Sequence, residues 1–64
     1  MLHERLEIPT LSTREKIALR MHSRGETPSE IARELLVHRG TASRIVARAI
    51  TKAELLRRMV GDVM

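Results

Sequence analysis

The fold of this chain is decided by residues 27–46, which read TPSEIARELLVHRGTASRIV. Thr27, Pro28 and Glu30 form a capping box with proline at the first helical position, a combination that marks the start of a helix. This helix is predicted to be short and to end near Leu35 or Leu36. Its inner face has the spacing of one side of an α-helix and consists of Ile31, Ala32 and Leu35.

A tight turn at residues 36–38 is predicted to lead into a second, basic helix that begins near Arg39. A short helix, a turn of three or four residues and a second helix make a helix-turn-helix. Ala32 provides the small side chain needed where the two helices cross. The residues predicted to face inward around the turn are Ile31, Leu35, Val37, Ala42 and Ile45. None of the outward positions is large and apolar; they are His38, Arg39, Gly40, Ser43, Arg44 and Ala47, with Arg48 just beyond.

Upstream of this motif, residues 1–10 are predicted to form an N-terminal arm. Pro9 disfavours helix at the residue before it, which separates the arm from the domain that follows. Ser12 and Glu15 form another capping box, so a helix is predicted to begin there. Gly25 is well placed to end that helix in the left-handed conformation.

Downstream of the motif, apolar residues recur with helical spacing as far as Val60, and Gly61 is predicted to end the helix. These residues are Ala42, Ile45, Val46, Ala49, Ile50, Ala53, Leu56 and Val60. However, residues 51–54 read TKAE, a third possible capping box. One long helix and two helices with a bend near Thr51 therefore both remain open. The fold predicted for residues 11–64 is an all-α helix-turn-helix bundle of three to four helices.

The charge of the chain is unevenly distributed. The net charge is +4 over the 64 residues, with histidine counted as neutral. Residues 1–37 carry as many acidic as basic side chains, so the whole excess of positive charge lies in residues 38–64. A basic segment beside a neutral one is typical of an element that faces phosphates. A solvated helix face explains the charge alone equally well.

The composition excludes several classes of function. A chain of 64 residues without cysteine or aromatic residues has no disulfide framework, no Cys-based zinc site and no platform for stacking bases. Its histidines are scattered, and no Ser/His/Asp arrangement indicates nucleophilic catalysis. We therefore expect no enzyme activity, cofactor, metal or small-molecule substrate. No apolar run is long enough for a membrane span or a signal peptide, so a soluble, cytoplasmic protein is expected.

Several segments together resemble a known family. They are residues 11–15 (LSTRE), residues 25–32 (GETPSEIA), Leu35 and Gly40-Thr41. They look like the LuxR-type (GerE-like) DNA-binding domain, and the promoter-reading C-terminal domain of sigma factors is similar in the same stretch. The chain departs from the family pattern at several positions: His38 replaces a capping Ser, Ala42 a Val and Ile45 a His, while Ala53-Glu54 replaces the usual Leu-Gly.

The resemblance implies a four-helix DNA-binding bundle whose third helix, here about Arg39–Lys52, lies in the major groove. Arginine pairs bidentately with guanine, and the free N–H groups at a helix N-terminus favour phosphate. The function predicted is therefore that of a sequence-specific, double-stranded DNA-binding transcriptional regulator. The DNA-binding residues predicted are Thr27, Ser29, His38, Arg39, Thr41, Ser43, Arg44, Ala47, Arg48 and Lys52.

The C-terminal segment contains more apolar residues than a three-helix core of this size can bury. We predict that Leu56 and Val60 face inward, and that Leu55, Met59 and Val63 contact a second copy in a homodimer on a near-palindromic site. An alternative function is a basic helical interaction module that docks on an acidic partner such as RNA polymerase. A ribbon-helix-helix dimer, with residues 3–8 as the strand, is disfavoured because that segment is acidic.

Overall fold

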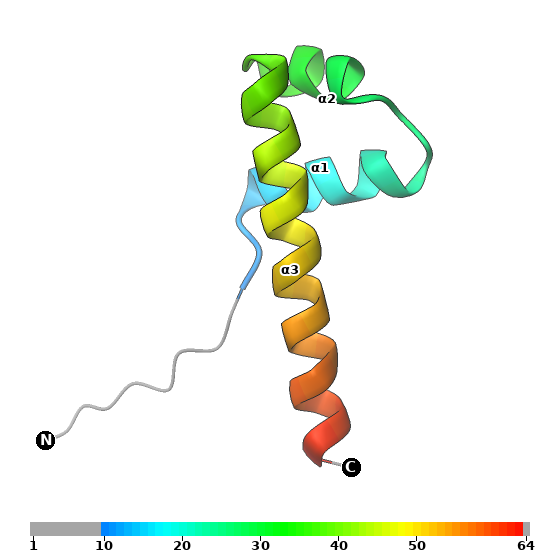
Figure 1. Ribbon diagram of the computed structural model, residues 1–64, viewed down its shortest axis with the longest axis vertical. Helices are drawn as coiled ribbons and strands as arrows, with labels where there is room; N and C mark the ends of the chain where they lie inside the picture. The colour runs from blue at the N-terminus through cyan, green and yellow to red at the C-terminus, as the bar shows by residue number, and fades with distance from the viewer. Residues whose placement is uncertain (1–9, 64) are drawn as a thin grey trace, which may run out of the picture.

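The chain forms three helices in the computed structural model, which describes the backbone of residues 10–63 and the side chains of residues 10–61. They are α1 (Thr13–Ser23), α2 (Pro28–Leu35) and α3 (Arg39–Val63). No strand occurs within the described residues, so the predicted all-α class is confirmed. α1 and α2 both cross one half of α3, and the C-terminal half of α3 extends beyond them (Figure 1). The predicted arm over residues 1–10 lies, except for Thr10, outside the described residues.

Both predicted capping boxes form, and they fix where α1 and α2 begin. At α1, the Ser12 N–H donates to Oε1 of Glu15 at 2.9 Å, and the Glu15 N–H donates to Oγ of Ser12 at 3.2 Å. At α2, the Thr27 N–H donates to Oε1 of Glu30 at 2.7 Å, and the Glu30 N–H donates to Oγ1 of Thr27 at 3.2 Å. Each box satisfies two backbone donors that a helix start leaves unpaired.

The ends of α1 and α2 both use the left-handed backbone conformation. Gly25 follows α1 with φ of 86°, as the sequence predicts. Leu36 ends α2 with φ of 58° and ψ of 46°, and the Val37 N–H then donates to the carbonyl of Ala32 at 3.0 Å. This conformation is unfavourable for a residue with a side chain. The Leu36 side chain gains no burial in return, because the residue is 88% exposed.

Replacing Leu36 by glycine is therefore expected to stabilise the protein. The variant removes the cost of a left-handed leucine, and we expect the free energy of unfolding to rise by about 1 kcal/mol. Thermal unfolding followed by circular dichroism should show a midpoint about 4–8 °C higher. Leu36→Ala is the control, since it shortens the exposed side chain but keeps the strain. Equal midpoints for the two variants would contradict this explanation.

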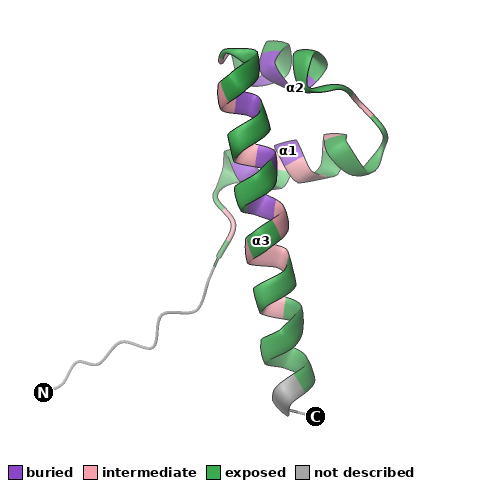
Figure 2. Cartoon of the chain, viewed as in Figure 1, coloured by how far each residue is buried: buried purple, intermediate pink, exposed green. Residues whose placement is uncertain are grey.

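The core lies where the three helices meet. Its buried side chains are Ala18, Ile31, Ala32, Leu35, Ala42 and Val46, and Ala49 is buried as well. Partly buried residues that pack against this cluster are Ile17, Met21, Val37, Ile45 and Ile50. The inward positions predicted around the turn are thus buried or half-buried. Figure 2 shows the buried positions on α1, α2 and the adjoining half of α3, with none among the described residues at the far end of α3.

α3 is one continuous helix through Thr51, which settles the alternative that the sequence leaves open. The third possible capping box does not form. The Thr51 hydroxyl instead donates to the carbonyl of Ala47 at 3.0 Å, within the helix. Three helices rather than four are therefore present in residues 10–63. The predicted end at Gly61 is wrong, because the helix continues to Val63.

The prediction that Val60 faces inward is also wrong. Val60 is 62% exposed, since neither α1 nor α2 reaches this part of α3. Leu56, which is one turn nearer the core, is half-buried. The surplus of apolar residues noted in the sequence therefore does not extend the core.

Candidate nucleic-acid interface

The N-terminal half of α3 presents a basic and largely polar outer face. Arg44 and Arg48 are four residues apart, so their side chains lie on the same side of the helix. Both are exposed, and so is Arg39 at the start of α3. The other exposed residues predicted here are Ser43 and Ala47 on this face and His38 before the helix, whereas Thr41 is half-buried.

Within the described part of the chain, no ion pair involves these arginines. Among the side chains of residues 10–61, the ion pairs join Arg24 to Glu26 and Lys52 to Glu15. Arg39, Arg44 and Arg48 take part in neither pair. A concentrated positive charge without an internal partner attracts an external anion more strongly than a paired one does. This half of α3 is therefore suited to a polyanionic partner.

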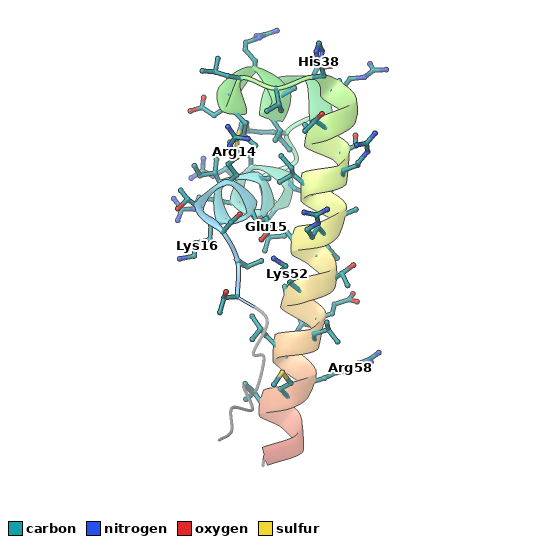
Figure 3. All side chains as sticks on the ribbon, turned by 90° about the vertical axis from the view of Figure 1, so that its left-hand side faces the viewer. Arg14, Glu15, Lys16, His38, Lys52 and Arg58 are labelled. Carbon is teal, nitrogen blue, oxygen red and sulfur yellow. The ribbon has the colours of Figure 1, made fainter. Side chains whose placement is uncertain are left out.

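The N-terminus of α3 differs from those of α1 and α2. Its first turn contains no acidic residue, and no side chain among residues 10–61 hydrogen-bonds to the backbone N–H groups of that turn, whereas each of the other helices has a capping box. The His38 carbonyl accepts the Ala42 N–H at 2.9 Å. Figure 3 shows the His38 side chain at this end of the bundle, directed away from it. The positive end of the helix dipole is therefore not compensated by a carboxylate here.

Two predicted contact residues lie at the start of α2. Thr27 and Ser29 are both exposed. Oγ1 of Thr27 accepts the Glu30 N–H at 3.2 Å and lies 3.3 Å from Oε1 of Glu30. The first role of Thr27 is therefore to cap the helix. α2 and α3 follow each other through the turn, so both helix starts belong to one helix-turn-helix.

Lys52 is placed differently from the other predicted DNA-binding residues. Its ammonium donates to Oε1 of Glu15 at 2.9 Å and to the carbonyl of Thr10 at 3.2 Å. The Glu15 side chain is only 6% exposed, so this pair joins α1 to α3 in a largely buried setting. Figure 3 shows Lys52 directed toward Glu15, apart from the N-terminal half of α3.

The Glu15 carboxylate has two roles at once. It accepts the Ser12 N–H in the capping box of α1 and the Lys52 ammonium from α3. The hydrogen bond from the Ser12 backbone, followed by that from Lys52, lowers the pKa of the Glu15 carboxyl below its ordinary value. The ionised form is therefore the one that stabilises the folded protein.

This arrangement predicts a pH-dependent stability. Because the folded-state pKa of Glu15 is lowered, its contribution is present above the ordinary carboxyl pKa of about 4.3 and is lost as the pH falls through the lowered value. Glu15→Gln should be less stable than the natural chain at about pH 7, and this difference should shrink toward about pH 3. Urea unfolding at both pH values measures it. Glu34→Gln, at an exposed position of α2, is the control; a difference for Glu15→Gln that does not vary with pH would contradict the assignment.

A shallow hollow of about 300 Å³ lies beside the exposed face of α3. It is lined mainly by apolar residues: Pro28 and Ile31 of α2, and Val46, Ala47 and Ile50 of α3. Ser43 also lines it, and His22 and Glu26 contribute from the end of α1 and the segment that follows. No local sequence pattern indicates this hollow, because its residues come from separate elements.

The C-terminal half of α3 exposes apolar residues. Leu55 is 41% exposed and Met59 is 40% exposed, and Val60 lies close to them in the sequence. Val63, the third residue predicted at a dimer contact, has a side chain outside the described residues. Leu55 and Met59 are four residues apart and so share one side of the helix. This side of α3 is thus an apolar surface, formed by Leu55 and Met59, that the described part of the chain leaves partly uncovered.

Comparison with known proteins identifies no relative: no protein family, no curated protein and no solved structure matches this chain. No helix within residues 10–63 has the length and apolar character needed to cross a membrane. In the same part of the chain, His, Asp and Glu residues form no group of three or more that would hold a metal ion.

Proposed function

We propose that this protein is a sequence-specific, double-stranded DNA-binding transcriptional regulator that inserts the N-terminal half of α3 into the major groove. The observation that carries the proposal is the set of exposed, unneutralised arginines, Arg39, Arg44 and Arg48, on the second helix of a helix-turn-helix. The major groove of B-DNA is about 12 Å wide and admits an α-helix. The resemblance to LuxR-type domains points the same way and stays a prediction.

The side chains of the motif divide into two groups by what they reach. Arg44 and Arg48 lie on the outer face of α3, where each is able to pair with O6 and N7 of a guanine. Phosphates are the expected partners of Thr27, Ser29 and Thr41, and of the uncapped N–H groups that follow His38 and Arg39. Lys52 is left out of the proposed contact, since its ammonium is held by Glu15 and Thr10.

The proposal includes a homodimer on a near-palindromic site. α3 continues without a break from the arginines to the apolar surface formed by Leu55 and Met59. A second copy that covers this surface would place a second recognition helix on the same DNA. Helix-turn-helix dimers read half-sites about 34 Å apart, or a multiple of that distance.

The proposal is tested by selecting sequences from a random double-stranded DNA library with the purified protein, and then titrating the selected complex with KCl. A regulator of this kind enriches one sequence and binds it in the presence of unrelated competitor DNA. The logarithm of its affinity should fall linearly with the logarithm of the salt concentration, with a slope of about −0.9 per phosphate contacted. Binding without any preferred sequence would contradict a regulatory role, and no binding near physiological salt would contradict DNA binding altogether.

The dimer is tested by the double variant Leu55→Ser with Met59→Ser. Because both residues are exposed and lie outside the core, we expect the fold to persist while the stoichiometry on a two-half-site DNA falls from two copies to one. Affinity for that DNA should drop at least about tenfold, since fully burying such a side chain contributes about 1.5–3 kcal/mol and the exposed share of both side chains is lost from both copies. Sedimentation of the complex gives the stoichiometry. Glu54→Ser, on the same segment but charged, is the control; an unchanged two-copy complex would exclude this surface as the dimer contact.

The alternative of a protein-interaction module is favoured by one observation. Leu36 is 88% exposed in the turn between α2 and α3, and the exposed cations Arg33 and Arg39 lie close to it in the sequence. An exposed apolar residue among cations suits an acidic protein partner with an apolar pocket, such as RNA polymerase. Leu36→Gly separates the two functions, because it should weaken such docking and leave DNA binding unchanged.

A further inference from the structure

The hollow beside α3 lies on the flank between the buried and exposed sides of this helix. Ser43, Ala47 and Ile50 follow one another at intervals of four and three residues, which places them along one line of the helix surface. Val46 and Ile31 are buried, whereas Ala47 and Ser43 are exposed. The hollow therefore opens beside the face that carries Arg44 and Arg48.

The lining of the hollow limits what it is able to receive. Pro28, Ile31, Val46, Ala47 and Ile50 offer only apolar side chains. Glu26 also lines it, but its carboxylate lies 3.9 Å from the Arg24 guanidinium, whose positive charge partly offsets that of the carboxylate. Ser43 and His22 add polar groups but are a minority of the lining, so a polar base edge placed here would find few partners to replace its hydrogen bonds to water. An apolar group of the partner is favoured instead.

We infer that this hollow receives the C5-methyl group of a thymine in the major groove. The inference rests on the proposed function, in which α3 lies in that groove. Thymine is the one base that presents an apolar group there, and contact with an alanine methyl is a recognised way to read it. The arginines beside the hollow attract the DNA. Ala47 belongs both to the exposed face and to the hollow, so DNA bound at that face places the thymine methyl group against an apolar surface.

The assignment makes Ala47 a specificity-determining residue. Arg44 and Arg48 select guanines by hydrogen bonds, whereas the hollow selects one thymine by burying its methyl group. The selected DNA should therefore contain a thymine at a fixed distance from the guanines in each half-site.

The test replaces each thymine of the library-selected site in turn by deoxyuridine, which lacks only the C5-methyl group. For the natural chain we expect one replacement per half-site to weaken binding about fourfold, the effect of one buried methyl-sized group. In the Ala47→Ser variant, which places a hydroxyl in the hollow, the same replacement should weaken binding less than about twofold. Ala53→Ser, the same change on the C-terminal half of α3, is the control and should keep the fourfold effect.

Three outcomes overturn the inference, and they differ in what they say of the proposed function. A specific site whose binding is indifferent to every deoxyuridine excludes a methyl contact but leaves DNA recognition standing. A thymine effect that Ala47→Ser leaves unchanged places the methyl group elsewhere on the protein. Failure to select any DNA sequence removes the proposed function and this inference together. Circular dichroism of each variant confirms that the helices are intact.

Discussion

Replacing both Arg44 and Arg48 by alanine is expected to lower affinity for the selected DNA site by at least about thirtyfold. Each well-placed arginine–guanine pair contributes about 1–3 kcal/mol, and about 1.4 kcal/mol corresponds to a factor of ten. Both side chains are exposed and take part in no ion pair among the described residues, so the fold should persist. Fluorescence anisotropy with a labelled duplex at a fixed KCl concentration measures the loss.

The matched control is Arg14→Ala with Lys16→Ala, which removes the same charge from exposed positions of α1 (Figure 3). These residues lie away from the outer face of α3, so this variant should lose only a few-fold in affinity through the change in net charge. Equal losses in the two variants would show that overall charge, not the face of α3, governs binding. An Arg44/Arg48 variant that retains its specific affinity would contradict the proposed interface.

Replacing Ile31 by alanine is expected to leave the protein largely unfolded near 37 °C. Ile31 is 1% exposed and is the largest fully buried side chain in the described part of the chain. Truncating a buried isoleucine to alanine costs about 2–5 kcal/mol, and a single core of this size rarely supplies more than about 3–5 kcal/mol. Urea unfolding followed by circular dichroism should show the transition shifted to very low denaturant or lost.

Two variants with smaller expected losses of stability serve as controls for this result. Ile31→Val removes one methylene and should cost about 0.5–1.5 kcal/mol, so the protein stays folded and the loss is measurable. Val60→Ala, at a position that is 62% exposed, should change stability by no more than about 0.5 kcal/mol. A Val60→Ala variant as unstable as Ile31→Ala would mean that the end of α3 is covered in solution even in the absence of DNA.

Features that depend on neighbouring residues could be predicted from the sequence. The capping boxes at Ser12 and Thr27 form as expected, because each is completed within four residues of chain. Gly25 adopts the left-handed conformation for the same local reason. The inner face of the helix-turn-helix also follows from helical spacing, which is set by the backbone alone. Arg44 and Arg48 do not belong to the inward-facing positions of that spacing, so their exposure on the outer face could be predicted as well.

Features that depend on distant residues could not be predicted in this way. Glu15 and Lys52 are 37 positions apart, and nothing in either local sequence indicates that they pair. From the sequence alone, Lys52 is therefore not distinguishable from the exposed arginines of the same helix. The continuity of α3 is a further example. Residues 51–54 have the sequence pattern of a capping box, but the Thr51 hydroxyl is hydrogen-bonded within the helix and α3 continues through these residues. The hollow beside Ala47 needs three segments to come together and has no local signal at all.

Because α3 is continuous, the number of residues between Arg48 and Leu55 sets both the distance and the angle between the arginines and the apolar surface. In one unbroken helix, each inserted residue lengthens the spacing by about 1.5 Å and rotates everything beyond it by about 100°. Inserting one residue would turn the apolar surface away from its original direction relative to the arginines. Inserting seven would restore that direction to within about 20° and move the surface about 10 Å further along. Homologues in which both surfaces keep their roles should therefore differ in length here by nearly whole numbers of helical turns, such as about seven or about eleven residues. Each such step should change the half-site spacing that they read.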